Sequence, residues 1–461
     1  MNHMKSLYHF LPPPPNTKID LSKPIRVTLL AAFILLPFSH LRWLPELGTT
    51  RPISSILFVL AFGFICLEYI LAGLGSLRWH LFNLPGWKFL RYWLILIALG
   101  ALSALITPFY GNFFQAINRL LGYLIIFTTL YCTLYALQRF GISQIAFWIS
   151  IGYLPALFYG LFEALVAFKI PWAITLVLAV RQHFIVDVSW SQRLSLFTTE
   201  PSFVSFQLLL LIAIIPFLKQ RLLRLSNIAI ILLALTFSLS GNVILQVLVY
   251  LIMLGFFSLS PRIQLRLSAA TALLGGLAWV SYTFIKSIQA AIQSILAVVM
   301  QVSRFKDMTL SAAIRGSYIQ NLIFALVDTH GIGLGIGQYG QFWKEIYLRH
   351  INYKPLGVEV ANALASNEYM RPWSVILGIG VDLGVVGLIL ILGFLYEVWR
   401  GIRRAATYAA HGQAIWVSSV LALVGAYPIV TPHIWIALAL LAGLASQQLT
   451  QISTIQAQPS Q

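Results

Sequence analysis

Apolar runs of about 20 residues recur along this chain, and no other feature limits its fold as strongly. A helix of that length crosses the roughly 30 Å hydrocarbon core of a bilayer. Of the 461 residues, 59% are hydrophobic and only 9% are charged, which is too few charges for the surface of a soluble protein of this length. The sequence therefore predicts an all-α polytopic membrane protein.

The apolar runs predict about twelve transmembrane helices. They cover residues 25–44, 53–74, 92–110, 117–137, 144–168, 202–218, 225–241, 242–258, 267–285, 374–398, 412–428 and 431–448. Ser238, Ser240 and Gly241 predict a tight turn between the seventh and eighth spans. A signal peptide is not expected, because the first 24 residues have no apolar core, so the first span is expected to act as the targeting signal.

Lysines and arginines in the short loops predict the orientation, since such residues are retained in the cytoplasm. With the N-terminus inside, the inner short loops carry twelve of these residues and the outer ones only Arg42, Arg51 and Arg119. We therefore expect both termini to be cytoplasmic. The predicted segments are a tail (1–24), helices 1–5 (25–168), an outer loop (169–201), helices 6–9 (202–285), a large helical outer loop (286–373), helices 10–12 (374–448) and a tail (449–461).

The formal net charge is +17. In a soluble domain this would suggest nucleic acid, but in a membrane protein orientation and anionic lipid-linked ligands explain it better. The two long loops hold eleven of the 30 basic residues and seven of the 13 acidic ones. These residues are either a solvated surface or a binding site, and no nucleic-acid partner is expected.

Arginines in the two outer loops are the candidate substrate-binding residues. A guanidinium stays charged and grips phosphate oxygens in pairs, which suits the diphosphate of a lipid-linked substrate outside a bilayer. The alternative is pairing with loop acids or lipid headgroups. The candidates are Arg181, Arg193, Arg304, Arg315 and Arg371.

Alternating glycines follow His330, from Gly331 to Gly337. A dinucleotide site would need a preceding strand, which the sequence does not predict, and nucleotides are scarce outside the cell. Instead, Gly331 is expected to end a helix, and the later glycines to allow close packing against another element. One face of that helix is predicted to be apolar, through Ile319, Leu322, Ile323 and Leu326.

Glu200 precedes Pro201 at the mouth of the sixth span. A carboxylate there is either a helix cap or a catalytic group. Glu200 is the first choice for a general base, and Glu368 and His350 come after it. Histidine spacings typical of metal sites and paired acids two residues apart are both missing from the sequence, so no metal or cofactor is expected. Within spans, the costly acids Glu163 and Asp382 are expected to be paired or to reach the interface.

Taken in order, several motifs resemble the O-antigen polymerase and ligase superfamily of bacterial envelope polysaccharide assembly. The motifs are Arg193 with 199–202 (TEPS), 236–241 (TFSLSG), 330–342 (HGIGLGIGQYGQF) and 381–387 (VDLGVVG). The resemblance rests on the order of these motifs and on the large loop before the third span from the end. It covers nearly the whole chain. The loop positioning residues would be His330, Gly335, Gly337 and Tyr339.

The resemblance implies glycan transfer on the outer face of the bacterial inner membrane, without nucleotide or metal. The donor would be a saccharide on undecaprenyl diphosphate, with Arg193 and Arg315 holding the diphosphate. The acceptor would be a second lipid-linked repeat unit for a polymerase or a lipid A core for a ligase, and a chain-length regulator is a possible partner. The family's ligases carry a histidine where this chain reads Arg371-Pro372-Trp373-Ser374, so a polymerase of O-antigen or exopolysaccharide type is expected.

Other functional classes stay open at the level of sequence. A lipid-linked oligosaccharide flippase would also have about twelve spans and basic residues, but such transporters show two similar halves, which are not evident here. An assembly scaffold would show no turnover.

Overall fold

The computed structural model describes residues 21–38, 53–71, 84, 87–109, 111–185, 194–198, 203–238, 240–266, 268–269, 303–350, 364–365, 370–404, 408–425 and 431–456, with only the backbone for 303–315 and 445–456. These residues form helices joined by turns. The first group is α1 (Ser22–Ile34), α2 (Ile53–Leu71), α4 (Trp87–Ile106), α5 (Phe113–Phe140), α6 (Ile142–Gly152), α7 (Leu154–Ala167) and α8 (Pro171–Phe184). The second is α9 (Val204–Ile214), α10 (Arg221–Phe237), α11 (Gly241–Phe257), α14 (Ser303–Asp328), α15 (Tyr339–His350), α17 (Val375–Arg404), α18 (Ala409–Gly425) and α19 (Pro432–Gln456).

Five helical stretches of the described chain are long and apolar enough to cross a membrane. They are Ile53–Leu71, Trp87–Phe109, Phe113–Phe140, Ile142–Val166 and Val375–Arg404. Shorter apolar helices cover Val204–Phe217, Asn242–Phe257, Ala409–Gly425 and Pro432–Leu444. The fold is compatible with the predicted all-α membrane protein. Most of the predicted ninth span, residues 270–285, lies outside the described residues.

Local sequence explains several helix boundaries. Asn112 caps α5, with its side-chain oxygen accepting from the backbone N–H of Gln115 at 3.2 Å, and Gly141 ends the helix with φ +75°. The tight turn predicted between the seventh and eighth spans is confirmed, because α10 ends at Phe237 and α11 begins at Gly241.

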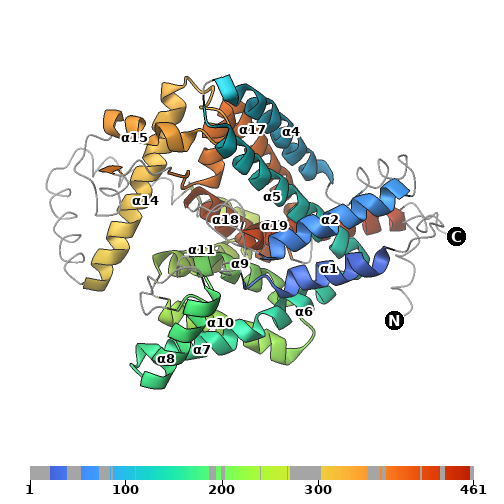
Figure 1. Cartoon of the computed structure of the whole chain (residues 1–461). Coiled ribbons are helices and arrows are strands. Elements are labelled where there is room, and N and C mark those ends of the chain that lie inside the picture. Colours follow the sequence, from blue (N-terminus) through green and yellow to red (C-terminus); the bar gives the residue numbers. More distant parts are fainter. Residues whose placement is uncertain are drawn as a thin grey trace.

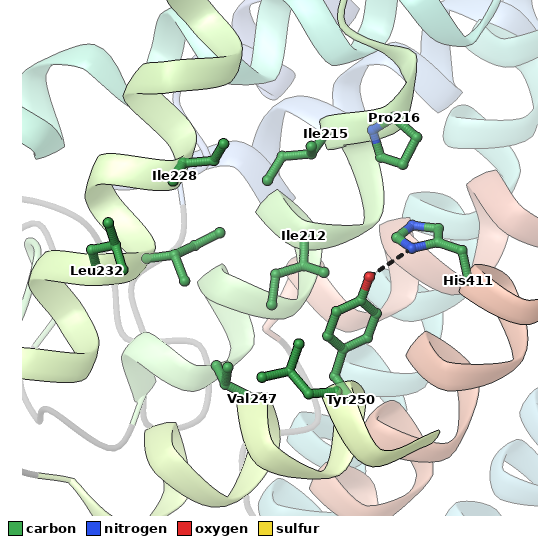
Figure 2. A pocket seen from close by; sticks show the side chains of 10 residues that line it. Ile212, Ile215, Pro216, Ile228, Leu232, Val247, Tyr250 and His411 are labelled. Carbon is green, nitrogen blue, oxygen red and sulfur yellow. Dashed lines mark hydrogen bonds between the residues drawn. The ribbon is translucent and has the colours of Figure 1, made fainter. Parts of the chain in front are cut away.

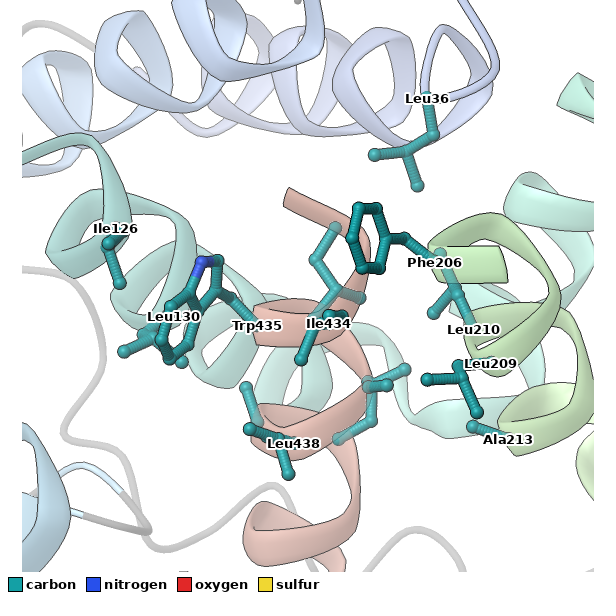
Figure 3. Packing of buried hydrophobic residues seen from close by; sticks show 14 of the residues in the cluster. Leu36, Ile126, Leu130, Phe206, Leu209, Leu210, Ala213, Ile434, Trp435 and Leu438 are labelled. Carbon is teal, nitrogen blue, oxygen red and sulfur yellow. The ribbon is translucent and has the colours of Figure 1, made fainter. Parts of the chain in front are cut away.

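The core is centred on α19. Figure 3 shows Ile434, Trp435 and Leu438 of α19 between Ile126 and Leu130 of α5 on one side and Phe206, Leu209 and Leu210 of α9 on the other. All of these side chains, on α19 and on the facing sides of α5 and α9, are at most 4% exposed. A helix that is apolar all round, such as α9, is expected in this central position.

Figure 1 shows how the helices are arranged around this core. The start of α1 and the end of α19 lie at the right of the view, whereas α14 and α15 lie at the opposite end of the bundle. There α14 runs across the end of the bundle rather than along it. Helices α14 and α15, the described helices of the predicted large outer loop, therefore lie at one end of the molecule.

Candidate functional site

The glycine segment begins at the C-terminal end of α14. The N–H of Gly331 donates to the carbonyl of Leu326 at 2.8 Å and that of His330 to Val327 at 2.9 Å, which is the pairing of a Schellman motif. His330 has φ +51° and Gly331 has φ +78°. The predicted stop at Gly331 is thus one residue late, because the left-handed backbone already begins at His330.

The predicted close packing of the glycines is confirmed. A methyl group added at Gly333 would lie 2.6 Å from the backbone nitrogen of Gly384, and one added at Gly337 would lie 2.5 Å from the carbonyl oxygen of Gln115. Both glycines, like Gly335, have positive φ. The loop therefore fits against α17 and α5 only with glycine at these positions.

Backbone hydrogen bonds fasten this loop to α17. The N–H of Leu334 donates to the carbonyl of Val381 at 2.7 Å, and the N–H of Val385 donates to the carbonyl of Gly331 at 2.8 Å. Between these bonds lies Gly384, with φ +69° and ψ −161°. The helix ladder of α17 is interrupted there, and loop carbonyls and amides replace it.

The break at Gly384 folds α17 back on itself. A methyl group added at Gly387 would lie 2.7 Å from the carbonyl oxygen of Ile379, although residues eight apart in a straight helix are separated by about 12 Å. The predicted span 374–398 is therefore interrupted at Gly384. Residues 375–383 form a short helix, too short to cross a bilayer, and the membrane-length helix follows Gly384.

Asp382 lies at this turn and joins three elements. Its Oδ2 accepts from Nε of Arg119 at 2.6 Å and from the Tyr123 hydroxyl at 2.8 Å, and its Oδ1 accepts from the N–H of Gly337 at 3.0 Å. The side chains of Asp382 and Arg119 are 1% and 7% exposed. The expected pairing of Asp382 is confirmed. Arg119 is a buried residue of α5, not the outer-loop residue that the orientation count assumed.

The buried face of α14 is shifted from the predicted one. Tyr318, Asn321, Leu322 and Ala325 are buried, whereas Ile323 is 46% exposed. The Asn321 side chain donates to the carbonyl of Trp343 in α15 at 2.9 Å. The prediction counted only aliphatic residues, but here a tyrosine and an asparagine turn toward the neighbouring helix.

Trp373 stacks on Tyr318, with ring centroids 5.5 Å apart and planes at 5°. This contact joins the segment before α17 to the turn of α14 that carries Arg315, because position 315 precedes Tyr318 by three residues and shares its side of the helix. Arg371 lies two residues before Trp373. Two of the five candidate arginines therefore come from the same junction of α14 and α17.

Arg119 approaches the same junction from α5. A methyl group added at Gly378 would meet Nη2 of Arg119 at 2.8 Å and Cβ of Pro372 at 3.1 Å. Ser374 caps the short helix, with its hydroxyl oxygen accepting from the N–H of Leu377 at 3.2 Å. The Arg119 guanidinium and the N-terminus of the short helix thus meet the segment of Pro372 at this junction, and Asp382 lies at the C-terminal end of the same helix.

His350, the last residue of α15, lies against the C-terminal turns of α14. Its Nε2 is 2.7 Å from Oδ1 of Asp328, and its ring stacks on Phe324 at 4.5 Å. Because a carboxylate only accepts, Nε2 of His350 carries a proton in this pair. Asp328, which sequence reasoning missed as a partner, lies 22 residues from His350 in the chain.

His350 and Arg315 are far apart along α14. Phe324 and Asp328 follow Arg315 by nine and thirteen residues, which corresponds to about 14 and 20 Å of helix. A general base must lie within hydrogen-bond reach of the attacking hydroxyl. This separation argues against His350 as a base that acts beside Arg315.

Arg181 belongs to a separate buried cluster. Its Nη1 donates to the Ser195 hydroxyl at 2.6 Å and lies 3.5 Å from Oε1 of Glu163. The Glu163 carboxylate also accepts from the N–H groups of Ser195 and Leu196 at 2.9 and 3.0 Å. Arg181 is only 3% exposed, so in this structure it anchors the segment 194–198 to α7 and α8.

Tyr339 begins α15 and is 1% exposed. It packs with Tyr318, Leu322 and Trp343 in the small core between α14 and α15. Burial raises the pKa of its hydroxyl, which therefore stays neutral. Tyr339 holds α15 against α14, in keeping with the positioning role proposed for it.

Several candidates fall outside the described residues. They are Arg193, Glu200 and Glu368. Arg304 and Arg315 lie on α14, where only the backbone is described. His330 is exposed at the end of α14.

A cavity of about 240 Å³ lies among α9, α10, α11 and α18. Figure 2 shows that its lining is aliphatic except where the Tyr250 hydroxyl meets Nδ1 of His411, at 2.9 Å. None of the candidate site residues lines it. A cavity so poor in polar groups does not suit a saccharide diphosphate.

Compared with known proteins, the chain matches no protein-family model and no curated protein. Its functional assignment therefore depends on the residues gathered at the end of the bundle. Sequence reasoning had placed Arg315 and Arg371 in one loop, but it missed Arg119 and Tyr123. The signal for Arg119 was available, because an arginine within the apolar stretch 113–137 needs a buried partner.

Proposed function

We propose that this protein is a membrane glycosyltransferase that polymerises undecaprenyl-diphosphate-linked repeat units on the outer face of the bacterial inner membrane. The proposed topology has twelve spans and two cytoplasmic termini. The observation that supports it best is the Trp373–Tyr318 stack, because this contact brings the segment of Arg371 to the turn of α14 that carries Arg315. Two forked cations at one place suit a diphosphate.

In the proposed mechanism, the acceptor hydroxyl attacks the anomeric carbon of the donor while the bond to the diphosphate breaks. The transfer inverts the anomeric centre and releases undecaprenyl diphosphate. Arg315 and Arg371 stabilise the charge that develops on the leaving group, with the N-terminus of α17 adding a partial positive charge. A carboxylate takes the proton of the acceptor hydroxyl.

Glu368 is the base we favour among the three candidates. It lies three residues from Arg371, so the chain itself keeps their Cα atoms within about 11 Å. His350 is disfavoured by its distance from Arg315 along α14. Glu200 stays a second candidate, because its sequence position beside Arg193 at the mouth of a predicted span suits the same chemistry.

The test uses the purified full-length protein in liposomes with a lipid-diphosphate-linked repeat unit. Glycans longer than one unit are expected for the wild type, and Arg315→Ala and Arg371→Ala should each lower the rate by about 10²-fold or more, as for other groups that stabilise transition-state charge. Arg349→Ala is the matched control, because this arginine is exposed on α15 and pairs with Glu345 and Asp328. Its activity should be unchanged.

Glu368→Gln and Glu200→Gln separate the two carboxylates. Loss of turnover with retained donor binding is expected for Glu368→Gln only. Unchanged chain lengths in both arginine variants would refute the diphosphate site. Transfer only to an added lipid A core would indicate a ligase, and movement of an unchanged glycan across the bilayer would indicate a flippase.

A further inference from the structure

Five exposed apolar side chains form one edge of the functional end of the molecule. They come from α14, the glycine loop and α17, and we refer to them as the apolar edge. They are Ile323 (46% exposed), Val327 (62%), Ile332 (81%), Val385 (50%) and Val386 (56%).

The apolar edge is continuous across the three elements. Ile323 and Val327 are four residues apart on α14 and so lie on the same side of the helix. Val385 donates its N–H to the carbonyl of Gly331 at 2.8 Å, and a methyl group added at Gly331 would touch Cγ2 of Val385 at 2.9 Å. Ile332 follows directly. The edge is therefore a single surface, on the side of α14 away from its buried face.

The apolar edge continues along the membrane-length part of α17. Ile389, Leu392 and Tyr396 are 62%, 53% and 60% exposed, and their spacing from Val385 places all four on one side of the helix. This helix is among those apolar enough to cross a bilayer. Single exposed apolar residues are common, but a contiguous exposed apolar surface marks an interface.

The glycine loop meets the requirement for backbone at membrane depth. Non-helical backbone is tolerated there only where the protein itself satisfies its polar groups. The N–H of Leu334 donates to Val381, that of Ile336 to the Ser103 hydroxyl at 3.0 Å, and that of Gly337 to Asp382. The loop therefore depends on protein partners at these positions rather than on water.

We propose that the apolar edge contacts the acyl chains of bilayer lipids, so that the end of α14 and the glycine loop lie in the boundary between headgroups and hydrocarbon. An amphipathic helix lying on a membrane has this arrangement. The sequence-based expectation was a large outer loop over residues 286–373. The inference concerns the surface alone and holds whether or not the protein is a glycosyltransferase.

Nitroxide accessibility in liposomes tests the proposal. Single cysteines replace Val327, Ile332 and Val386 in the full chain with Cys66 and Cys132 changed to alanine, and are spin-labelled in vesicles of phosphatidylethanolamine and phosphatidylglycerol. Leu392→Cys is the lipid control on α17. Glu345→Cys is the water control on α15, because that carboxylate side chain is 65% exposed.

Oxygen partitions into hydrocarbon, whereas a water-soluble nickel chelate does not. The ratio of oxygen to nickel accessibility at positions 327, 332 and 386 should be several-fold above that at 345 and approach that at 392. A ratio equal to that at 345 would place the edge in water and overturn the proposal. Low accessibility to both reagents would overturn it as well, because the edge would then be covered by a second copy or another protein. Three independent label sites guard against one variant that fails to fold.

Discussion

At the scale of single residues, two buried acids hold segments between the helices in place. Asp382 joins α5, α17 and the glycine loop through Arg119, Tyr123 and Gly337. Glu163 does the same for α7, α8 and residues 194–198. Each carboxylate accepts several hydrogen bonds, which offsets the cost of removing its charge from water.

Removing Asp382 should be strongly destabilising. Asp382→Ala leaves the Arg119 charge buried without its carboxylate, a change that typically costs about 3–5 kcal/mol. A lower midpoint of thermal unfolding in detergent is expected. The double variant Arg119→Met, Asp382→Leu should recover part of the loss, because it removes both charges. Equal stability of Asp382→Ala and the wild type would contradict the role given to this pair.

His330→Gly should stabilise the protein slightly. His330 occupies left-handed backbone with φ +51°, which costs a residue with a side chain about 1–2 kcal/mol relative to glycine. A rise in the unfolding midpoint with unchanged polymerisation is expected, and the two measurements together separate a positioning role from a chemical one. Loss of activity in a stable His330→Gly variant would give the imidazole a direct function.

At the scale of elements, the end of α14, the glycine loop and the fold-back of α17 form one unit. The loop supplies the hydrogen-bond partners that α17 lacks at Gly384, and α17 supplies the carboxylate that fixes Gly337. The Trp373–Tyr318 stack adds a second contact, between α14 and the segment that precedes α17. The geometry of this stack fixes how the backbone that carries Arg371 lies relative to the turn of α14 that carries Arg315.

Gly384→Ala should therefore disrupt the unit. An added methyl group would meet the carbonyl oxygens of Gly331 and Ile332, at a residue with φ +69°. We expect a lower unfolding midpoint and much reduced polymer formation. Gly63→Ala in α2 is the control, because nothing lies within 4 Å of a methyl group there. If both variants behaved alike, the docking of the loop on α17 would not matter for function.

At the scale of the whole molecule, the candidate site occupies one end of the bundle. The start of α1 and the end of α19 lie at the opposite end of the bundle (Figure 1). This arrangement fits cytoplasmic termini with an outer site, as the basic residues of the short loops predict.

Labelling of intact cells tests that orientation. Gln320 on α14 and Arg262 after α11 are both exposed, and they are predicted to lie outside and inside, respectively. In a background with Cys66 and Cys132 changed to alanine, a membrane-impermeant maleimide should label Gln320→Cys and spare Arg262→Cys until the cells are broken. The opposite pattern would invert the topology and remove the outer-face proposal.

The sequence by itself determined the class of fold, because repeated apolar runs of membrane length leave a helical bundle as the stable solution. It also identified the glycine segment as a packing loop and Asp382 as an acid in need of a partner. It did not identify that partner, since Arg119 lies 263 residues away and periodicity reports only on local structure. The fold-back at Gly384 was equally hidden, because the apolar run continues on both sides of it. Only tertiary structure, by bringing distant helices together, decided which buried charges neutralise each other.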